Sequence, residues 1–425
     1  MEVCYLDNLK TPWIYLIGMG ADGIDSLSVK AKALLESADI LVSSQRLFDL
    51  IPQDNRHRII WQSPLSETLP AIESHRGKRV AIIATGDPLN YGVGSWLLTK
   101  FALDEMLIVP GISSHVLACA RMGWTQQNTQ LLTLHGRDQN TIRGAIAPGQ
   151  KLVVLSEDAK TPGIVCQHLI ELGYGNSELV VFAHMDGKKE QRFDCLGKEG
   201  RALFDTAFEA NPDHDLNVIT INCKASSNAR VLSRAPGLDD AHFANFSKLS
   251  KRDMRALAIS KLAPQPGDIF WDVGAGSASI AVEFLRLAPR GKAFTFDHDA
   301  SVQAFQDENA QNFGLLDSLK IGGTTLPNPK DKLAIPNPDA LFIGGGVSMQ
   351  IIDDSIQFLK SGGRLVAHAV TLESETILAT AFAKHGGEMS RISVARLDAL
   401  GKSGAHGFRP AMSITQWCWQ KDRAT

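Results

Sequence analysis

The sequence predicts an α/β protein of two domains, and three observations lead to this fold class. The 425 residues exceed what one ordinary hydrophobic core encloses. Short apolar segments repeatedly end in Gly-rich or polar turns and continue into helical patterns, which is typical of parallel sheets with ligand-binding turns at the strand ends. A small, polar stretch at 224–247 interrupts this alternation. We therefore divide the chain into residues 1–235 and 236–425.

The first domain is expected to contain two α/β lobes. In the first lobe we predict strands at 13–17, 40–42, 79–84 and 107–109, with helices at about 26–37 and from about 114 to 121. In the second lobe we predict strands at 131–134, 152–155, 179–182 and 217–221, with helices near 161–172 and 199–209. Turns such as 85–88 and 110–114 follow strands directly, so we expect them at one edge of the sheet.

The second domain reads as one further α/β unit. Ser250 is the expected N-cap of a helix that continues over 254–262, with Asp253 as its capping-box acid. After it we predict strands at 269–273, 293–296, 340–343 and 364–367, with a helix at about 278–287.

Composition excludes several classes of protein. The formal net charge is −3, which disfavours a nucleic-acid partner, although a local basic cleft remains compatible with it. Six cysteines form no CxxC pair and no His cluster has zinc-ligand spacing, so we expect no metal site and reduced thiols in a cytoplasmic protein. The first ten residues lack the apolar region of a signal peptide, and no apolar run approaches the roughly 20 residues of a membrane helix.

A glycine loop in the second domain carries the chemical signal. Gly274 and Gly276 lie between a strand and a helix, where the absence of Cβ lets backbone approach a ligand. Asp297 follows about 20 residues later at the end of the next strand, where an acid can bind ribose hydroxyls. Ser279 replaces the third glycine of nicotinamide-binding loops, and Asp272 suits a cofactor with an amino-acid tail. The loop therefore favours S-adenosylmethionine, with a plain structural turn as the alternative.

Four segments of the second domain resemble a known family: 250–257 (SKRDMRAL), 271–277 (WDVGAGS), 342–346 (FIGGG) and 369–373 (AVTLE). They are similar to the CbiT-type, decarboxylating carbon-15 methyltransferases, which have a Rossmann-like methyltransferase fold. In the first domain, segments 18–20, 44–46, 86–94 and 134–137 resemble the CbiE-type carbon-5 methyltransferases of the tetrapyrrole methylase family. The two sets of segments, in this order over roughly residues 13–420, resemble the CobL-type family, in which the two methyltransferases are fused in one chain.

The resemblance implies a reaction and its cofactor. It implies that precorrin-6B is methylated at carbons 5 and 15 and loses carbon dioxide from the acetate on carbon 12, with one S-adenosylmethionine site in each half. In the first half, the implied cofactor contacts are Gly86, Asp87, Pro88, Tyr91, Ser113 and Ser114. In the second half, the contacts are Ser250, Asp272, Gly274, Ala275, Gly276, Ser277, Ala278, Asp297, Thr324 and Thr325, with the two threonines replacing the acid and alanine usual in relatives.

The implied substrate is a small tetrapyrrole with many carboxylates, so basic side chains are expected to contact it. The candidates are Lys251, Arg252, Arg255, Arg396 and Arg409 in the second half, and Arg46 and Arg137 in the first. Arg255 and Arg409 are favoured because they match the family pattern, and a solvated surface charge is the alternative for each candidate. His368 and Glu373 are candidate proton donors for decarboxylation, and His135 is interpreted as structural.

Three other functions remain to be compared with this interpretation. The chain could methylate RNA or protein, since fold alone does not fix the acceptor. One half could bind cofactor or intermediate without catalysis, and an NAD-dependent oxidoreductase would use a similar glycine loop. The resemblance also implies a homo-oligomer. The sequence leaves open the oligomer's size, the order of the two methylations, the proton donor, and whether the substrate ring carries cobalt.

Overall fold

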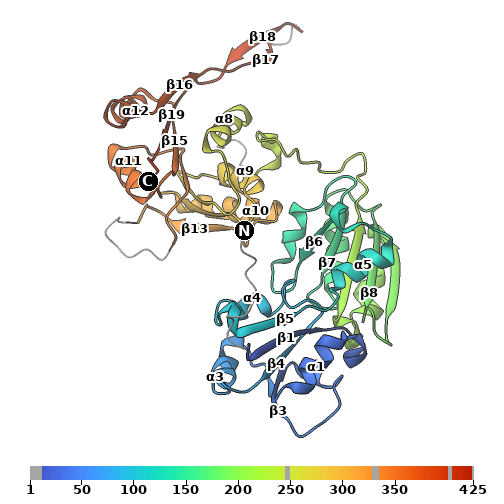
Figure 1. The fold of residues 1–425 in the computed structure, drawn as a ribbon. Helices are drawn as coiled ribbons and strands as arrows, with labels where there is room; N and C mark the ends of the chain where they lie inside the picture. Colours follow the sequence, from blue (N-terminus) through green and yellow to red (C-terminus); the bar gives the residue numbers. More distant parts are fainter. Residues whose placement is uncertain (1–11, 245–248, 328–334, 401–403, 424–425) are drawn as a thin grey trace, which may run out of the picture. The chain divides into compact units, whose positions relative to one another are not determined.

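The computed structural model describes residues 12–244, 249–327, 335–400 and 404–423. The chain forms two compact units, which are described separately below (Figure 1). Unit 1 contains residues 1–139 and 146–230, and unit 2 contains residues 140–145 and 231–425. Both units combine helices with sheets that contain parallel strands, so the predicted α/β class is confirmed.

The first lobe of unit 1 is a five-stranded parallel sheet with the order β3-β2-β4-β1-β5. These strands are β1 (Ile14–Met19), β2 (Ile40–Ser43), β3 (His57–Ile60), β4 (Val80–Thr85) and β5 (Met106–Val109). All six residues of β1 are buried, because helices cover both faces of the sheet. One face packs against α1 (Val29–Ser37) and α2 (Gln45–Phe48), and the other against α3 (Leu69–Glu73) and α4 (Gly94–Leu97).

The second lobe of unit 1 has a mixed sheet with the order β6-β7-β10-β8-β9. Its strands are β6 (Thr129–Thr133), β7 (Lys151–Leu155), β8 (Glu178–Ala183), β9 (Gln191–Leu196) and β10 (Asn217–Asn222). Only β6 and β7 pair in parallel, and the remaining pairs are antiparallel. The associated helices are α5 (Ser114–Met122), α6 (Thr161–Glu171) and α7 (Gly197–Leu203). The helix predicted near 199–209 is present as α7 together with a π-helical turn, Phe204–Phe208, that continues it.

Unit 2 is built on a seven-stranded sheet with the order β13-β12-β11-β14-β15-β19-β16. The strands are β11 (Ile269–Val273), β12 (Lys292–Phe296), β13 (Leu319–Gly323), β14 (Ala340–Ile343), β15 (Arg364–Ala369), β16 (Glu388–Ile392) and β19 (Ile414–Gln420). The first five in spatial order are parallel, and β19 and β16 are antiparallel additions.

Helices cover both faces of this sheet with separate hydrophobic clusters. One face carries α8 (Arg252–Leu262), α9 (Ser279–Leu287) and α10 (Gln303–Asn312), and the other carries α11 (Met349–Phe358) and α12 (Leu372–His385). Figure 1 shows a hairpin of β17 (Ala395–Ala399) and β18 (His406–Pro410) extending away from the sheet. None of the helices in the described ranges is long and apolar enough to cross a membrane.

The start of α8 differs from the prediction. Lys251 occupies the N-cap position with extended backbone, and its side chain makes no capping hydrogen bond. Ser250 therefore lies one residue before the cap, and the proposed pairing with Asp253 as a capping box is wrong. The Asp253 side chain instead binds Arg396, because that arginine from β17 offers a full opposite charge.

Candidate active sites

Unit 1 contains a cavity of about 430 Å³ that residues of both lobes line. The first lobe contributes the carboxyl end of β4 and the following turn, from Ile83 to Gly86 and from Asn90 to Val93. The second lobe contributes side chains of β6, β7, β8 and the strand β10, including Thr133, Leu155, Phe182 and Val218. The cavity therefore lies at the strand ends where parallel α/β sheets bind ligands.

Three glycines allow the strand ends of the first lobe to meet beside this cavity. A Cβ added at Gly18 would lie 1.9 Å from the carbonyl oxygen of Gly86 and 2.2 Å from the amide nitrogen of Gly111. The Gly86 amide donates to Met19 at 2.9 Å, and the Gly111 amide donates to Gly86 at 3.1 Å. Gly18 thus serves close backbone packing, which a side chain would prevent.

Three of the six predicted cofactor contacts of unit 1 line the cavity, namely Gly86, Tyr91 and Ser114. The other three shape the adjoining loops. The Asp87 carboxylate accepts a hydrogen bond from the Leu89 amide at 2.9 Å, and Ser113 caps α5 by accepting from Val116 at 3.4 Å. Pro88 packs against Gly92, where a Cβ would lie 2.5 Å from the proline carbonyl oxygen.

Two further polar side chains reach the cavity. Arg46 lines it and donates to the Thr85 hydroxyl at 2.8 Å. His135 also lines it, with Nδ1 at 3.4 Å from the Glu157 carboxylate. The predicted substrate residue Arg137 is exposed and is not among the residues that line this cavity.

In unit 2 the glycine loop and Asp297 are brought together as the spacing predicts. The Gly276 amide donates to the Asp297 carboxylate at 2.7 Å, directly beyond the ends of β11 and β12. A Cβ at Gly274 would lie 2.6 Å from the Gly345 amide nitrogen, so the two glycine loops pack backbone against backbone. Asp297 in turn donates its own amide to Gly323 at 3.2 Å, which places the turn with Thr324 and Thr325 next to the acid.

Two buried oxygen atoms at this loop have no hydrogen-bond partner among the described residues. They are Oδ1 of Asp272 and Oγ of Ser277. Burial raises the pKa of Asp272 to about 7, the charge of Asp297 adds to this effect, and a hydrogen bond from the Ala281 amide opposes it. Orphaned buried polar atoms beside an open glycine loop fit a polar ligand such as the amino-acid tail of S-adenosylmethionine.

The rest of the predicted loop is held rigidly. Ala278 has a left-handed φ of 60° and is the N-cap residue of α9, and Ala275 accepts a hydrogen bond from its amide at 2.8 Å. Sequence reasoning missed two buried amides of α10 that fix the loop from behind. Gln306 donates to the Gly276 carbonyl at 2.9 Å, and Asn309 donates to the Ser277 carbonyl at 2.8 Å. Their spacing of three residues on one helix face was the available signal.

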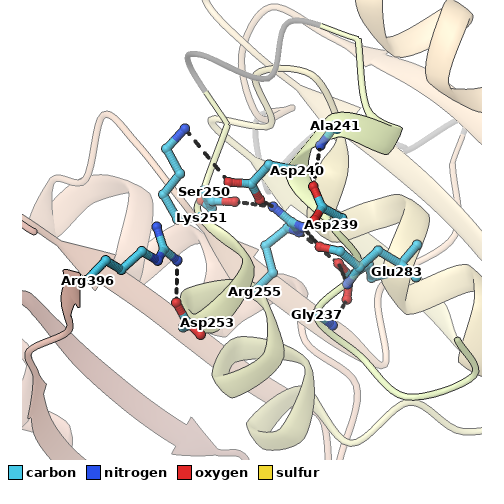
Figure 2. A network of polar contacts seen from close by, with 11 residues as sticks. Gly237, Asp239, Asp240, Ala241, Ser250, Lys251, Asp253, Arg255, Glu283 and Arg396 are labelled. Carbon is cyan, nitrogen blue, oxygen red and sulfur yellow. Dashed lines mark hydrogen bonds and ion pairs between the residues drawn. The ribbon is translucent and has the colours of Figure 1, made fainter. Parts of the chain in front are cut away.

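Arg255 does not contact a substrate cleft, contrary to the prediction. Its side chain is fully buried, because a network of ion pairs and carbonyl groups surrounds its guanidinium (Figure 2). Nε donates to Glu283 at 2.7 Å, and Nη1 donates to Asp240 at 2.7 Å and to the Ser250 carbonyl at 2.5 Å. The half-buried Ser250 is therefore positioned by Arg255, while Lys251 lies 3.9 Å from Asp240.

The remaining basic candidates of unit 2 lie on the hairpin or at the surface. Arg396 of β17 is exposed and pairs with Asp253, as Figure 2 shows. Arg409 of β18 is exposed and lies 3.4 Å from Asp398 on the facing strand. Arg252 is also exposed. These three side chains are therefore accessible to solvent.

The two candidate proton donors differ in accessibility. His368 is buried, its Nε2 lies 2.9 Å from Gln416 Oε1, and its ring packs edge-on against Phe342. Burial lowers the pKa of His368, so the ring is neutral and held inside the sheet rather than open to a ligand. Glu373 is exposed in the first turn of α12, where hydrogen bonds from its own backbone amide and from Thr371 lower its pKa.

Two family models match the chain, one in each half. The model of the tetrapyrrole (corrin/porphyrin) methylases matches residues 13–198. The model of the precorrin methyltransferase domain matches residues 241–421.

Individual proteins match the whole chain or one half. The precorrin-6Y C(5,15)-methyltransferase [decarboxylating] of a Sinorhizobium species is 35% identical over 417 residues, which cover 97% of each chain. The cobalt-precorrin-7 C(5)-methyltransferase of Salmonella typhimurium is 24% identical over 206 residues, which cover 48% of this chain and 96% of that protein. The solved C-terminal domain of precorrin-6Y C5,15-methyltransferase from Rhodobacter capsulatus is 36% identical, covers 45% of this chain and 100% of its own, and has a TM-score of 0.42.

Proposed function

The chain belongs to the family of decarboxylating precorrin-6Y C(5,15)-methyltransferases, and from this premise we propose its reaction. It uses S-adenosylmethionine to methylate precorrin-6B (precorrin-6Y in the names of its relatives) at carbons 5 and 15. It also removes carbon dioxide from the acetate on carbon 12, which yields precorrin-8X in cobalamin biosynthesis. The observation that carries the proposal is the 35% identity to such an enzyme over 97% of both chains.

We assign one methylation to each half of the chain. Residues 1–235 are assigned carbon 5, which is supported by the match of the tetrapyrrole methylase model to residues 13–198 and by a carbon-5 methyltransferase that matches 48% of this chain. Residues 236–425 are assigned carbon 15 and the decarboxylation, in a Rossmann-like domain whose strand order β13-β12-β11-β14-β15-β19-β16 suits that fold. Each half then holds its own S-adenosylmethionine.

In unit 2 the chain's own residues would hold the cofactor at the glycine loop. Asp297 fits ribose hydroxyls, and the orphaned Asp272 and Ser277 oxygens fit the polar tail. The bound cofactor supplies a methyl group on an already activated sulfonium. The protein's contribution is therefore positioning and exclusion of water rather than nucleophile activation. Gln306 and Asn309 hold the loop in place for this purpose.

In unit 1 the cavity is the proposed site for the second methyl transfer. Gly86, Tyr91 and Ser114 are its proposed cofactor contacts, and Asp87, Pro88 and Ser113 support them.

Gly344 to Gly346 in unit 2 are exposed and leave space beside the loop there for a flat ring. We further propose that the enzyme is cytoplasmic and forms a homo-oligomer, and the five free thiols among the described residues support a reducing compartment.

Methylation of RNA or protein is the alternative function. The test is incubation of the full chain with S-adenosylmethionine and precorrin-6B, followed by mass spectrometry of the product. We expect a product with two added methyl groups and one carbon dioxide lost. An unchanged tetrapyrrole mass, with S-adenosylhomocysteine still bound, would refute the tetrapyrrole as substrate while leaving a methyltransferase.

A further inference from the structure

Arg46 lies at the cavity of unit 1 on the short helix α2, which is anchored in the hydrophobic core. The helix α2 follows β2 directly, and Leu47 and Phe48 are only 2% and 3% exposed in the hydrophobic core. Because two of the four residues of this helix are buried, the backbone at Arg46 is held in place. Its Nη2 donates to the hydroxyl of Thr85, at the carboxyl end of β4, which orients the guanidinium along the cavity wall.

Among the residues that the structure describes, none near Arg46 supplies a counter-charge. Among the described residues that line the cavity, Arg46 is the single Lys or Arg, and there is no Asp or Glu. No ion pair joins Arg46 to any carboxylate in the described ranges. Seven other arginines of unit 1 each lie within 4.0 Å of an Asp or Glu: Arg56, Arg58, Arg76, Arg79, Arg121, Arg192 and Arg201.

A cation held in this way calls for an anionic ligand. The Arg46 side chain is exposed, so water reaches part of it; the protein around the guanidinium lowers its pKa, and the group stays charged at any physiological pH. Thr85 accepts from one nitrogen, and the other donors of the planar fork match a carboxylate in two parallel hydrogen bonds. A phosphate would fit less well, because a second cation usually shares its greater charge.

The other residues that line the cavity indicate the chemical character of the rest of the ligand. Trp61, Leu117, Phe182 and Met185 offer apolar surface, so the cavity suits a flat, apolar framework with a carboxylate at one side. We propose that Arg46 binds one acetate or propionate side chain of the tetrapyrrole and so determines which edge of the ring enters unit 1. This inference rests on the proposed function and adds to it a substrate-orienting residue.

The test uses the full chain with Arg46→Gln, Arg46→Lys and the control Arg79→Gln. Arg79 lies at the opposite end of β4, is half exposed and pairs with Asp39, so its loss leaves the cavity lining intact. For Arg46→Gln we expect the KM for the tetrapyrrole in carbon-5 methylation to rise roughly 10- to 100-fold, the usual loss for charge-assisted hydrogen bonds. A decarboxylated product with a single added methyl should accumulate, while the Kd for S-adenosylmethionine stays unchanged.

Arg46→Lys retains the charge but loses the fork, so its KM should lie between those of wild type and Arg46→Gln. Equal KM values and product ratios in wild type and Arg46→Gln, with matched thermal unfolding, would overturn the proposal. A weaker Kd for S-adenosylmethionine with an unchanged tetrapyrrole KM would overturn it too, because Arg46 would then serve the cofactor. If wild type itself adds no methyl to the tetrapyrrole, the proposed function fails and this inference fails with it.

Discussion

At the scale of single residues, unit 2 depends on one buried arginine. Arg255 joins the segment that enters the unit to α8 and α9, because Glu283 accepts from Arg255 and also from the amides of Gly237 and Leu238. The Arg255 guanidinium also lies 4.6 Å from the centre of the Phe243 ring. A partner lost from such a network leaves a charge buried without compensation.

Arg255→Met should therefore destabilise the protein strongly. We expect the free energy of unfolding to fall by about 3–5 kcal/mol, since Glu283 stays buried without its positive partner. Arg396→Met is the matched control, because its pair with Asp253 is exposed on both sides and such pairs contribute about 0–1 kcal/mol. Urea unfolding followed by circular dichroism measures both variants. Similar midpoint shifts for the two would contradict the assigned role of burial.

Asp272 gives the stability of unit 2 a defined pH dependence. Its pKa of about 7 exceeds the ordinary value of 3.8, so the folded state binds a proton that the unfolded state releases between these values. The free energy of unfolding should fall as pH rises from about 4 to 7, by on the order of 4 kcal/mol at most from this group.

Asp272→Asn should remove this part of the pH dependence. The asparagine oxygen can still accept from the Ala281 amide, and the side chain carries no titrating proton. Urea midpoints at pH 5 and pH 8, measured without cofactor, should differ less in the variant than in wild type. Parallel curves for the two proteins would show that Asp272 is ionised throughout.

At the scale of elements, the turns at strand ends decide where side chains are tolerated. Gly274 and Gly267 both have positive φ values, 68° and 83°, so alanine is strained at either position. They differ in space, because a Cβ at Gly274 meets the Gly345 backbone whereas nothing lies within 4 Å at Gly267.

Gly267→Ala should therefore lower the free energy of unfolding by only about 1–2 kcal/mol, the usual penalty for alanine in the left-handed conformation. Gly274→Ala should cost more and should also weaken binding of S-adenosylmethionine, since the two glycine loops must move apart. Thermal unfolding and calorimetric titration of both variants measure these effects. An equal loss of stability in the two would indicate that backbone strain alone matters.

The sequence predicted elements that have strong local signals. The loop with Gly276 and its pairing with Asp297 followed from spacing alone, because consecutive parallel strands end at the same edge. The antiparallel β9 was missed, since its residues are half exposed at the sheet edge and show no continuous apolar run. The burial of Arg255 could not be predicted either, because it depends on Asp240 and Glu283 arriving from other segments.

The same distinction applies to the cavity of unit 1. Gly86 and Tyr91 belong to one recognisable segment, and the sequence identified them. Phe182 and Val218 line the cavity from strands whose pattern only indicates a core, so nothing local marks them as ligand-facing. Arg46 was one of seven basic candidates, behind the favoured Arg255 and Arg409, until the structure placed it at a cavity whose described lining contains no Asp or Glu.

At the scale of the whole molecule, the two units have separate sheets and separate cores. We therefore expect residues 1–235 and 236–425, expressed apart, each to fold and to bind S-adenosylmethionine. With precorrin-6B, residues 236–425 should add one methyl group and release carbon dioxide, and residues 1–235 should then add the second to that product. Mass spectrometry after each addition checks the assignment. A first half that binds cofactor but never transfers a methyl would instead be a binding module.

The crossing of Gly18, Gly86 and Gly111 beside the cavity has a consequence for motion. Their amide hydrogen bonds join three separate strand ends, so solvent deuterium should reach the amides of Gly86 and Gly111 only when the first lobe opens as a whole. Hydrogen exchange there should be slow in the free protein and should change little when a ligand enters. A wall that is already ordered loses little conformational entropy on binding, so selection of the ligand depends on the shape and charge that the fold presents beforehand.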